Sequence, residues 1–173
     1  MNAEATHRAL LEKWRNAMDL VGSGPLDVHF EDSRAGVEGL RAAGRWADLG
    51  SGAGFPGVAL ATAFPDAQVL LVESREKRAQ FLRTLVAELG LKNLAVHHGR
   101  AEELEPGFDG VISRAMAAPA VVLAEAARLA PRGRTVLLLT DRQSVDLTGW
   151  RVEADREYAI GDKSRRRLVL ARG

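Results

Sequence analysis

The spacing of apolar residues divides the chain into helical and extended segments. Residues 5–20 are predicted to form an amphipathic helix, because apolar side chains recur there at intervals of one to four positions: Leu10, Leu11, Trp14, Met18 and Val21. Gly22-Ser23-Gly24-Pro25 interrupts this pattern. A second helical stretch is expected from about residue 25 to residue 43.

Five strand-like runs and two further extended segments in the tail then predict strands, with helices beginning near Gly57, after Glu73 and at Pro119. Gly161-Asp162-Lys163 is expected to turn the last two strands into a hairpin. The pattern predicts an α/β fold with a doubly wound, mostly parallel seven-stranded sheet, an antiparallel C-terminal hairpin and short N-terminal helices. We expect one compact domain, in which helices of residues 1–44 pack on a core of residues 45–173. The predicted strands lie near residues 45–49, 69–73, 94–98, 109–113, 134–140, 150–160 and 166–171.

A glycine-rich segment, residues 48–57, joins the first of these strands to its helix: Asp-Leu-Gly-Ser-Gly-Ala-Gly-Phe-Pro-Gly. Glycines at a strand–helix turn let backbone N–H groups approach a ligand closely. The segment fits G-x-G-x-x-G, typical of dinucleotide binding, and also acid-x-G-x-G-x-G, typical of S-adenosylmethionine-dependent methyltransferases. Asp48 favours the second, because a carboxylate repels a pyrophosphate unless it is turned away but attracts an ammonium and a sulfonium. An ordinary glycine-rich turn is the remaining alternative.

An acidic residue ends the second predicted strand, where either cofactor would present its ribose. Glu73 follows the glycine-rich loop by about twenty positions of sequence, the spacing at which an acidic residue at the end of the second strand accepts hydrogen bonds from both ribose hydroxyls. Alternatively, Glu73 only lies beside the next helix, with Ser74 as the N-cap and Glu76 near the positive helix end. We favour the ribose role.

These two segments together resemble the glucose-inhibited division protein B family, the bacterial enzymes that methylate N7 of a guanine in small-subunit (16S) ribosomal RNA. The resemblance covers residues 11–118 continuously and is fainter in the final strand. It implies the class I (Rossmann-like) methyltransferase fold and S-adenosyl-L-methionine as cofactor, with S-adenosyl-L-homocysteine as product. The residues that carry it lie in Asp48–Ala61, Glu73–Arg83, Glu88–Leu94, Gly99–Glu103 and Phe108–Ala115, with Trp14, Asp19-Leu20 and His29–Ser33 upstream.

The family's cofactor contacts can be transferred to matching positions. The resemblance implies that Ala101 and Glu102 face the adenine and that Arg114 neutralises the cofactor carboxylate. Glu102 could equally face water within an acidic loop, and Arg114 could form a salt bridge with Asp48 or Asp109. The expected cofactor-binding residues are Asp48, Gly50, Gly52, Gly54, Phe55, Glu73, Ala101, Glu102 and Arg114.

Candidates for contact with the RNA are a family motif ahead of the first strand and several basic residues. His29, Asp32 and Ser33 match that motif and could border the target guanine, although a histidine on a mostly apolar helix is more often packed in the core. The basic clusters around residues 75–83 and 163–167 could contact phosphates, or could be a solvated helix surface and a charged hairpin turn. The RNA candidates are His29, Asp32, Ser33, Arg100, Arg142, Arg165 and Arg166.

Methyl transfer to guanine N7 is expected to need no proton transfer by the protein. Guanine N7 has a lone pair and no proton to lose, so we expect no general base, and catalysis by alignment and electrostatics. The absence of cysteine excludes a cysteine nucleophile. The four histidines show no metal-ligand spacing with acids, so no metal is expected.

The lack of cysteine and of a long apolar run fit a cytoplasmic protein without a membrane segment. The formal charge of +1 is too small to indicate a nucleic-acid binder, so the distribution of the basic residues matters more. The expected partner is small-subunit ribosomal RNA or the assembled small subunit, bound by a monomer.

The chain departs from the family in two places. The family has a longer N-terminal helical region, and a Lys-Gly pair where this chain has Leu139-Thr140-Asp141, with Arg142 as a candidate replacement. The alternatives are therefore a methyltransferase of another RNA or a small molecule, and a silent relative that binds the ribosome. An NAD-binding module is a third, disfavoured by Asp48 and by the lack of room for a substrate domain.

Overall fold

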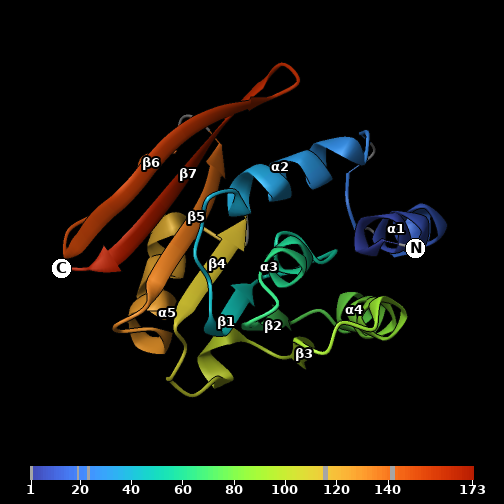
Figure 1. The fold of residues 1–173 in the computed structure, drawn as a ribbon, viewed down its shortest axis with the longest axis horizontal. Coiled ribbons are helices and arrows are strands. Elements are labelled where there is room, and N and C mark those ends of the chain that lie inside the picture. The colour runs from blue at the N-terminus through green and yellow to red at the C-terminus, as the bar shows by residue number, and fades with distance from the viewer. Residues whose placement is uncertain (1, 19, 23, 115–116, 141–142) are drawn as a thin grey trace.

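A seven-stranded sheet forms the centre of the molecule (Figure 1). The computed structural model describes residues 2–18, 20–22, 24–114, 117–140 and 143–173. In the order β3-β2-β1-β4-β5-β7-β6, β1 to β5 pair in parallel, whereas β7 pairs antiparallel with both neighbours. The strands are β1 (Gly44–Leu49), β2 (Ala67–Glu73), β3 (Leu94–His98), β4 (Gly110–Arg114), β5 (Arg134–Thr140), β6 (Trp150–Ile160) and β7 (Lys163–Arg172).

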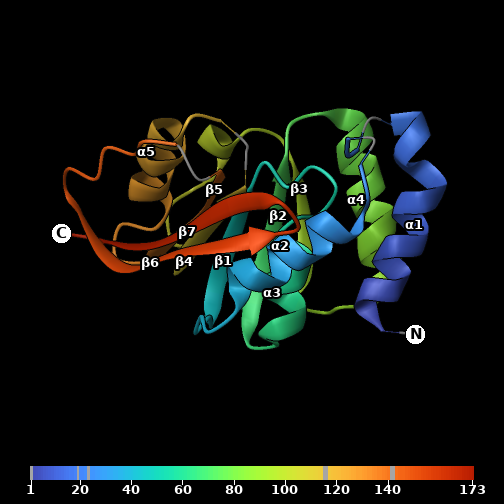
Figure 2. The same ribbon diagram turned by 90° about the horizontal axis from the view of Figure 1, so that it is seen from above.

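Helices cover both faces of this sheet (Figure 2). One face packs against α3 and α4, with α2 against α3 and α1 against α4, and the other face packs against α5. The expected doubly wound sheet with its antiparallel C-terminal hairpin is thereby confirmed. The helices are α1 (Ala3–Met18), α2 (Asp27–Val37), α3 (Gly57–Ala63), α4 (Glu76–Leu89) and α5 (Pro119–Leu129), with a short 3₁₀ turn, η1 (Ala101–Glu103).

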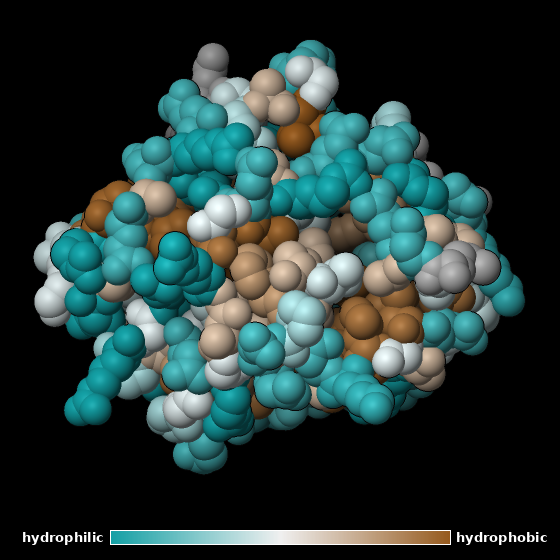
Figure 3. Space-filling view, viewed as in Figure 1, coloured by the Kyte–Doolittle hydropathy of each residue, from teal (hydrophilic) through white to brown (hydrophobic). Residues whose placement is uncertain are grey.

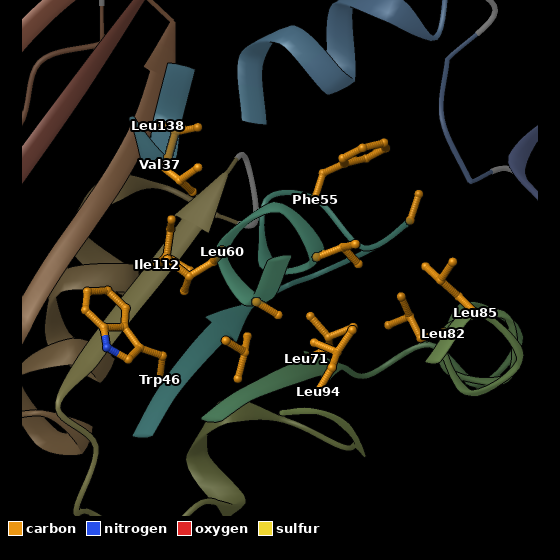
Figure 4. Packing of buried hydrophobic residues seen from close by; sticks show 14 of the residues in the cluster. Val37, Trp46, Phe55, Leu60, Leu71, Leu82, Leu85, Leu94, Ile112 and Leu138 are labelled. Atoms are coloured by element: carbon orange, nitrogen blue, oxygen red, sulfur yellow. The ribbon is translucent and has the colours of Figure 1, made fainter. Parts of the chain in front are cut away.

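The hydrophobic core lies on both sides of the sheet. On the α3 side, Trp46, Leu60 and Ile112 pack between β1, β4 and α3 (Figure 4). Gly57 lets α3 approach the sheet closely, because a Cβ there would collide with the side chains of Leu71 and Asp48. The third glycine of the G-x-G-x-x-G pattern therefore serves helix–strand packing.

Three local expectations were wrong. The second helical stretch ends at Val37 rather than near residue 43, with Gly39 at a positive φ of 70° shortly after it. The last strand begins at Lys163, so the basic cluster of residues 163–167 belongs to β7 and is not a hairpin turn. Arg75 rather than Ser74 is the N-cap of α4, and the Glu73 carboxylate accepts the Arg75 N–H there.

The surface of the face seen in Figure 3 is mostly hydrophilic, with hydrophobic patches separated by polar side chains. Among the described residues, Val121 and Val152 are the large apolar side chains that are exposed. None of the helices in the described part of the chain is long and apolar enough to cross a bilayer.

Candidate functional site

The carboxyl ends of the parallel strands bring the predicted site residues to one edge of the sheet, where α/β proteins bind their ligands. Two hollows lie there. The first, which we call the β2 cleft, has a volume of about 380 Å³. Its lining comprises Gly50, Val72, Glu73, Ser74, Arg75, Arg78, Gly99, Arg100, Ala101, Glu102, Val121 and Glu125.

The glycine-rich loop forms one wall of the β2 cleft. Gly50, Gly52 and Gly54 all have positive φ angles, of 72°, 57° and 94°, which only glycine adopts readily. The loop is tied to β2, because the N–H groups of Gly50 and Ser51 both donate to the Val72 carbonyl at 3.0 Å. The three glycines thus shape the turn, and Gly50 lines the cleft.

Glu73 links this loop to the start of α4. Its Oε2 accepts the Gly52 N–H at 3.1 Å and its Oε1 accepts the Arg75 N–H at 2.8 Å. The residue is only 6% exposed, yet it lines the cleft. Each carboxylate oxygen has a second lone pair, so Glu73 is held in place and keeps acceptor capacity toward a ligand.

Ala101 and Glu102 lie on the opposite wall, in η1. Arg128 of α5 holds this turn, donating to the carbonyls of Ala101 at 2.7 Å and Leu104 at 2.6 Å. Ala101 is buried, whereas the side chain of Glu102 is exposed at the cleft rim. The turn therefore presents its backbone and one carboxylate to the same space.

Asp48 lies beneath the loop instead of inside either hollow. It is fully buried, and its Oδ2 accepts the Gly57 N–H at 2.9 Å. Burial raises its pKa to about 7. The expected attraction to a cofactor ammonium is thus not supported by this geometry, since the carboxylate is turned inward and anchors α3 to β1.

Phe55 lies in an aromatic cluster behind the loop. Its ring stacks on His7 at 4.7 Å and on His29 at 5.6 Å, and meets Phe30 edge-on at 5.0 Å between ring centroids. The Arg114 guanidinium lies 5.0 Å from the Phe55 ring centroid. Phe55 lines neither of the two hollows, so its side chain positions Arg114 and the loop.

The second hollow, the β4–β5 pocket, has a volume of about 340 Å³ and lies beside the ends of β4 and β5. Its lining comprises Gly22, Gly24, Pro25, Val28, His29, Asp32, Arg114, Leu138, Leu139, Thr140, Gln143, Lys163 and Arg165.

Asp32 is the central acid of the β4–β5 pocket. It is 4% exposed, and it accepts the Tyr158 hydroxyl on Oδ1 at 2.8 Å and Arg114 Nη1 on Oδ2 at 3.2 Å. Arg165 Nε is 3.9 Å from the same Oδ1. The salt bridge predicted for Arg114 therefore exists, but its partner is Asp32 rather than Asp48 or Asp109.

The RNA candidates separate into different places. His29, Asp32 and Arg165 line the β4–β5 pocket, and Arg100 lines the β2 cleft. Ser33 is buried and its hydroxyl donates to the His29 carbonyl at 2.8 Å, outside both hollows. Arg166 pairs with Asp155 at 2.7 Å, and strand alternation turns it to the face opposite Arg165. Arg142 lies outside the described residues.

Three residues of this region were not anticipated: His7, Arg128 and Tyr158. His7 Nε2 lies 2.7 Å from the Ala53 carbonyl in the loop, and burial lowers its pKa to about 4. All three make contacts across more than twenty positions of sequence. No local sequence pattern predicts such contacts, because the partners lie far apart along the chain. Among the described residues, no group of three or more His, Cys, Asp or Glu side chains could hold a metal ion.

A family model described as rRNA small subunit methyltransferase G matches residues 5–158. The chain belongs to this family. Ribosomal RNA small subunit methyltransferase G of Cereibacter sphaeroides is 43% identical over 136 residues, 72% of this chain and 64% of that protein. The counterpart in Pseudomonas paraeruginosa is 40% identical, over 66% of this chain and 59% of that protein. The counterpart in Halorhodospira halophila is 37% identical, over 80% of this chain and 69% of that protein. The chain thus spans about two thirds or less of the length of these methyltransferase G relatives.

Solved methyltransferase structures share the fold at low sequence identity. A methyltransferase from Pyrococcus furiosus superposes with a TM-score of 0.69 at 18% identity, covering 98% of each chain. Magnesium protoporphyrin IX methyltransferase from Synechocystis PCC 6803 gives 0.65 at 17% identity, covering 96% of this chain and 97% of that one. The expected class I methyltransferase fold and the resemblance to the glucose-inhibited division protein B family are confirmed.

Proposed function

We propose that this chain transfers a methyl group from S-adenosyl-L-methionine to N7 of a guanine in 16S ribosomal RNA. The observation that carries the proposal is the β2 cleft, where the glycine loop, the Glu73 carboxylate and the η1 turn converge in a member of the methyltransferase G family. Such a substrate implies action in the cytoplasm, and we propose a monomer.

The β2 cleft suits the adenosine half of the cofactor. The Glu73 oxygens have lone pairs for the two ribose hydroxyls, and Ala101 and Glu102, which line the same cleft, would face the adenine. Arg114, beyond the loop, would pair with the cofactor carboxylate while keeping its bond to Asp32. When bound, S-adenosylmethionine supplies an electrophilic methyl group.

The β4–β5 pocket suits the target base. The apolar side chain of Val28 can contact the face of a purine, and the volume of about 340 Å³ is within the range of small-ligand pockets. Since N7 carries no proton, the lining residues need only orient its lone pair and exclude water.

Transfer of a labelled methyl group tests the proposal. The substrates would be small ribosomal subunits and free 16S RNA from cells that lack the family enzyme, with the modified base mapped afterwards. Label on a guanine N7 is the expected result, and the preferred substrate shows whether assembled ribosomal protein is needed. Label on another RNA base would show that the chain is a methyltransferase with a different target base.

A titration with S-adenosylhomocysteine and with NADH distinguishes the two alternative functions, a catalytically silent relative and an NAD-binding module. Binding of S-adenosylhomocysteine without methyl transfer would indicate a silent relative, and the position to examine first is Thr140, which lines the pocket in place of the family's Lys-Gly pair. Preference for NADH would contradict the cofactor assignment.

A further inference from the structure

The charges that line the β4–β5 pocket do not balance. Among its described lining residues, Arg114, Lys163 and Arg165 are basic and Asp32 is the one acid, so the formal charge is +2 (3 − 1). The proposed cofactor would not remove this excess, because its ammonium and sulfonium outnumber its single carboxylate. With Arg114 paired to Asp32 and to that carboxylate, the charges of Lys163 and Arg165 remain for a second anion in the same pocket.

Of the two guanidinium groups that line the pocket, Arg165 makes the weaker contact with Asp32. Arg165 Nε forms an ion pair with Asp32 Oδ1 at 3.9 Å, which is beyond hydrogen-bond distance, while the same oxygen accepts the Tyr158 hydroxyl at 2.8 Å. Its hydrogen bond within the described chain is from Nη1 to the neighbouring Ser164 carbonyl at 3.2 Å. The guanidinium thus faces the pocket with most of its donors available to a ligand.

Two neighbouring arginines of β7, Arg166 and Arg167, use their guanidinium donors in hydrogen bonds within the protein. Arg166 forms two hydrogen bonds with Asp155, at 2.7 and 2.8 Å. Arg167 is buried and donates to the carbonyls of Ala35 and Glu38 at the end of α2. Arg165 makes fewer hydrogen bonds than these two residues, Arg172 at the far end of the strand lies over the Trp150 ring, and Lys163 forms no ion pair with a described residue.

Lys163 and Arg165 are placed to act together. They are two positions apart on β7, so they project from the same face of the strand, about 7 Å apart along it. A phosphodiester between two such cations accepts hydrogen bonds from both, the guanidinium in bidentate fashion. Phosphate contacts of this type position a nucleic acid without reading its sequence.

We propose that Lys163 and Arg165 form a phosphate subsite that holds the backbone of the target nucleotide, leaving Arg114 to the cofactor. The proposal rests on the proposed function, because it assumes that a nucleotide enters this pocket. Asp32 lies between the two guanidinium groups, because its Oδ2 accepts Arg114 and its Oδ1 accepts Tyr158 and lies 3.9 Å from Arg165.

Binding of free 16S RNA at a series of KCl concentrations tests the subsite. The proteins are wild type, Lys163→Gln, Arg165→Gln, the double variant and the control Arg132→Gln, which removes one exposed charge just before β5, at the end opposite Thr140. We expect each single variant to weaken binding roughly 3- to 10-fold, and the double variant to lower the salt slope by about 0.7 for one lost phosphate contact. Arg132→Gln should match wild type, and all five proteins should bind S-adenosylhomocysteine equally.

Two results would overturn the subsite. One is a double variant with wild-type RNA affinity and salt slope; the other is a wild-type chain that binds S-adenosylhomocysteine but no RNA. Failure of the proposed function itself looks different, because wild type would then not bind S-adenosylhomocysteine, or would bind RNA through the subsite and transfer no methyl group.

Discussion

Glu73 combines a structural and a ligand-facing role in one carboxylate. Its two oxygens hold Gly52 and Arg75 in place, which orients the carboxylate toward the β2 cleft before any ligand arrives. A preoriented acceptor loses little entropy on binding. The sequence spacing identified Glu73, but the two backbone bonds that orient it became visible only in the fold.

Glu73→Ala should weaken S-adenosylhomocysteine binding by about 1–3 kcal/mol, because the ribose hydroxyls lose a charged acceptor. Isothermal titration calorimetry measures this, with Glu76→Ala as the control, since Glu76 lies in the exposed first turn of α4. Equal affinity of Glu73→Ala and wild type would remove the ribose assignment.

Gly57→Ala should lower the free energy of unfolding by about 1–3 kcal/mol, because the added Cβ meets Leu71 and Asp48 and forces α3 off the sheet. Urea unfolding measures the loss. Gly22→Ala is the control, because a Cβ at Gly22 has open space around it, and its effect should stay within about 0.5 kcal/mol. A Gly57→Ala protein as stable as wild type would contradict the packing role.

Among the elements, α1 is joined to the glycine-rich loop by a buried histidine. His7 packs between Phe30 and Phe55 and contacts the Ala53 carbonyl, so a helix from the start of the chain braces the loop from behind. The apolar spacing predicted α1 itself. It did not show which side chain would reach the loop, since His7 is polar and falls outside that apolar pattern.

This contact predicts a pH dependence of stability. Burial lowers the His7 pKa from 6.5 to about 4, so between these pH values the unfolded chain binds more protons and stability falls as pH falls. Asp48 has the opposite sign, because its pKa is raised from 3.8 to about 7 and its contribution to stability is lost as pH rises through that window.

Comparison with His7→Phe isolates the histidine from Asp48. Between pH 7 and pH 4, wild type should lose up to about 3 kcal/mol of unfolding free energy relative to His7→Phe. Urea unfolding at each pH provides the measurement, and parallel pH profiles of the two proteins would show that His7 is not buried as a neutral ring.

At the scale of the whole molecule, α1 and α2 share one hydrophobic cluster with the sheet. Leu11, Phe30 and Val37 pack in the same cluster as Trp46 and Ile112. We therefore propose that residues 1–44 and 45–173 unfold as one unit, as small single domains usually do.

The three tryptophans test this unity, because Trp14 lies on α1, Trp46 on β1 and Trp150 on β6. Two variants that keep only Trp14 or only Trp46 should show the same urea midpoint by fluorescence, and far-ultraviolet circular dichroism should agree. A lower midpoint reported by Trp14 would separate the N-terminal helices from the core.

The sheet could be predicted because its central strands contain apolar runs such as Val69–Val72 and Val136–Leu139, and a doubly wound topology follows from strand–helix alternation. The edge of the sheet at which a ligand would bind could also be predicted, because ligands of doubly wound sheets bind at the carboxyl ends of the strands. The position of Asp48 could not be predicted, because whether a carboxylate faces a ligand or the underside of a loop depends on tertiary packing. The bond between Asp32 and Tyr158 joins residues 126 positions apart, and neither segment carries a pattern that signals the other.

The outermost position of β6 has a consequence for aggregation. An edge strand offers unpaired backbone groups to other chains, but this one carries Arg151, Glu153 and Glu157 as exposed charges, which oppose edge-to-edge contact. Were β6 and β7 to detach, β5 would become the edge, with the uncharged apolar run Val136–Leu139 laid bare. Such runs readily form intermolecular β-structure. The charged hairpin therefore shields the apolar run of β5 from neighbouring molecules.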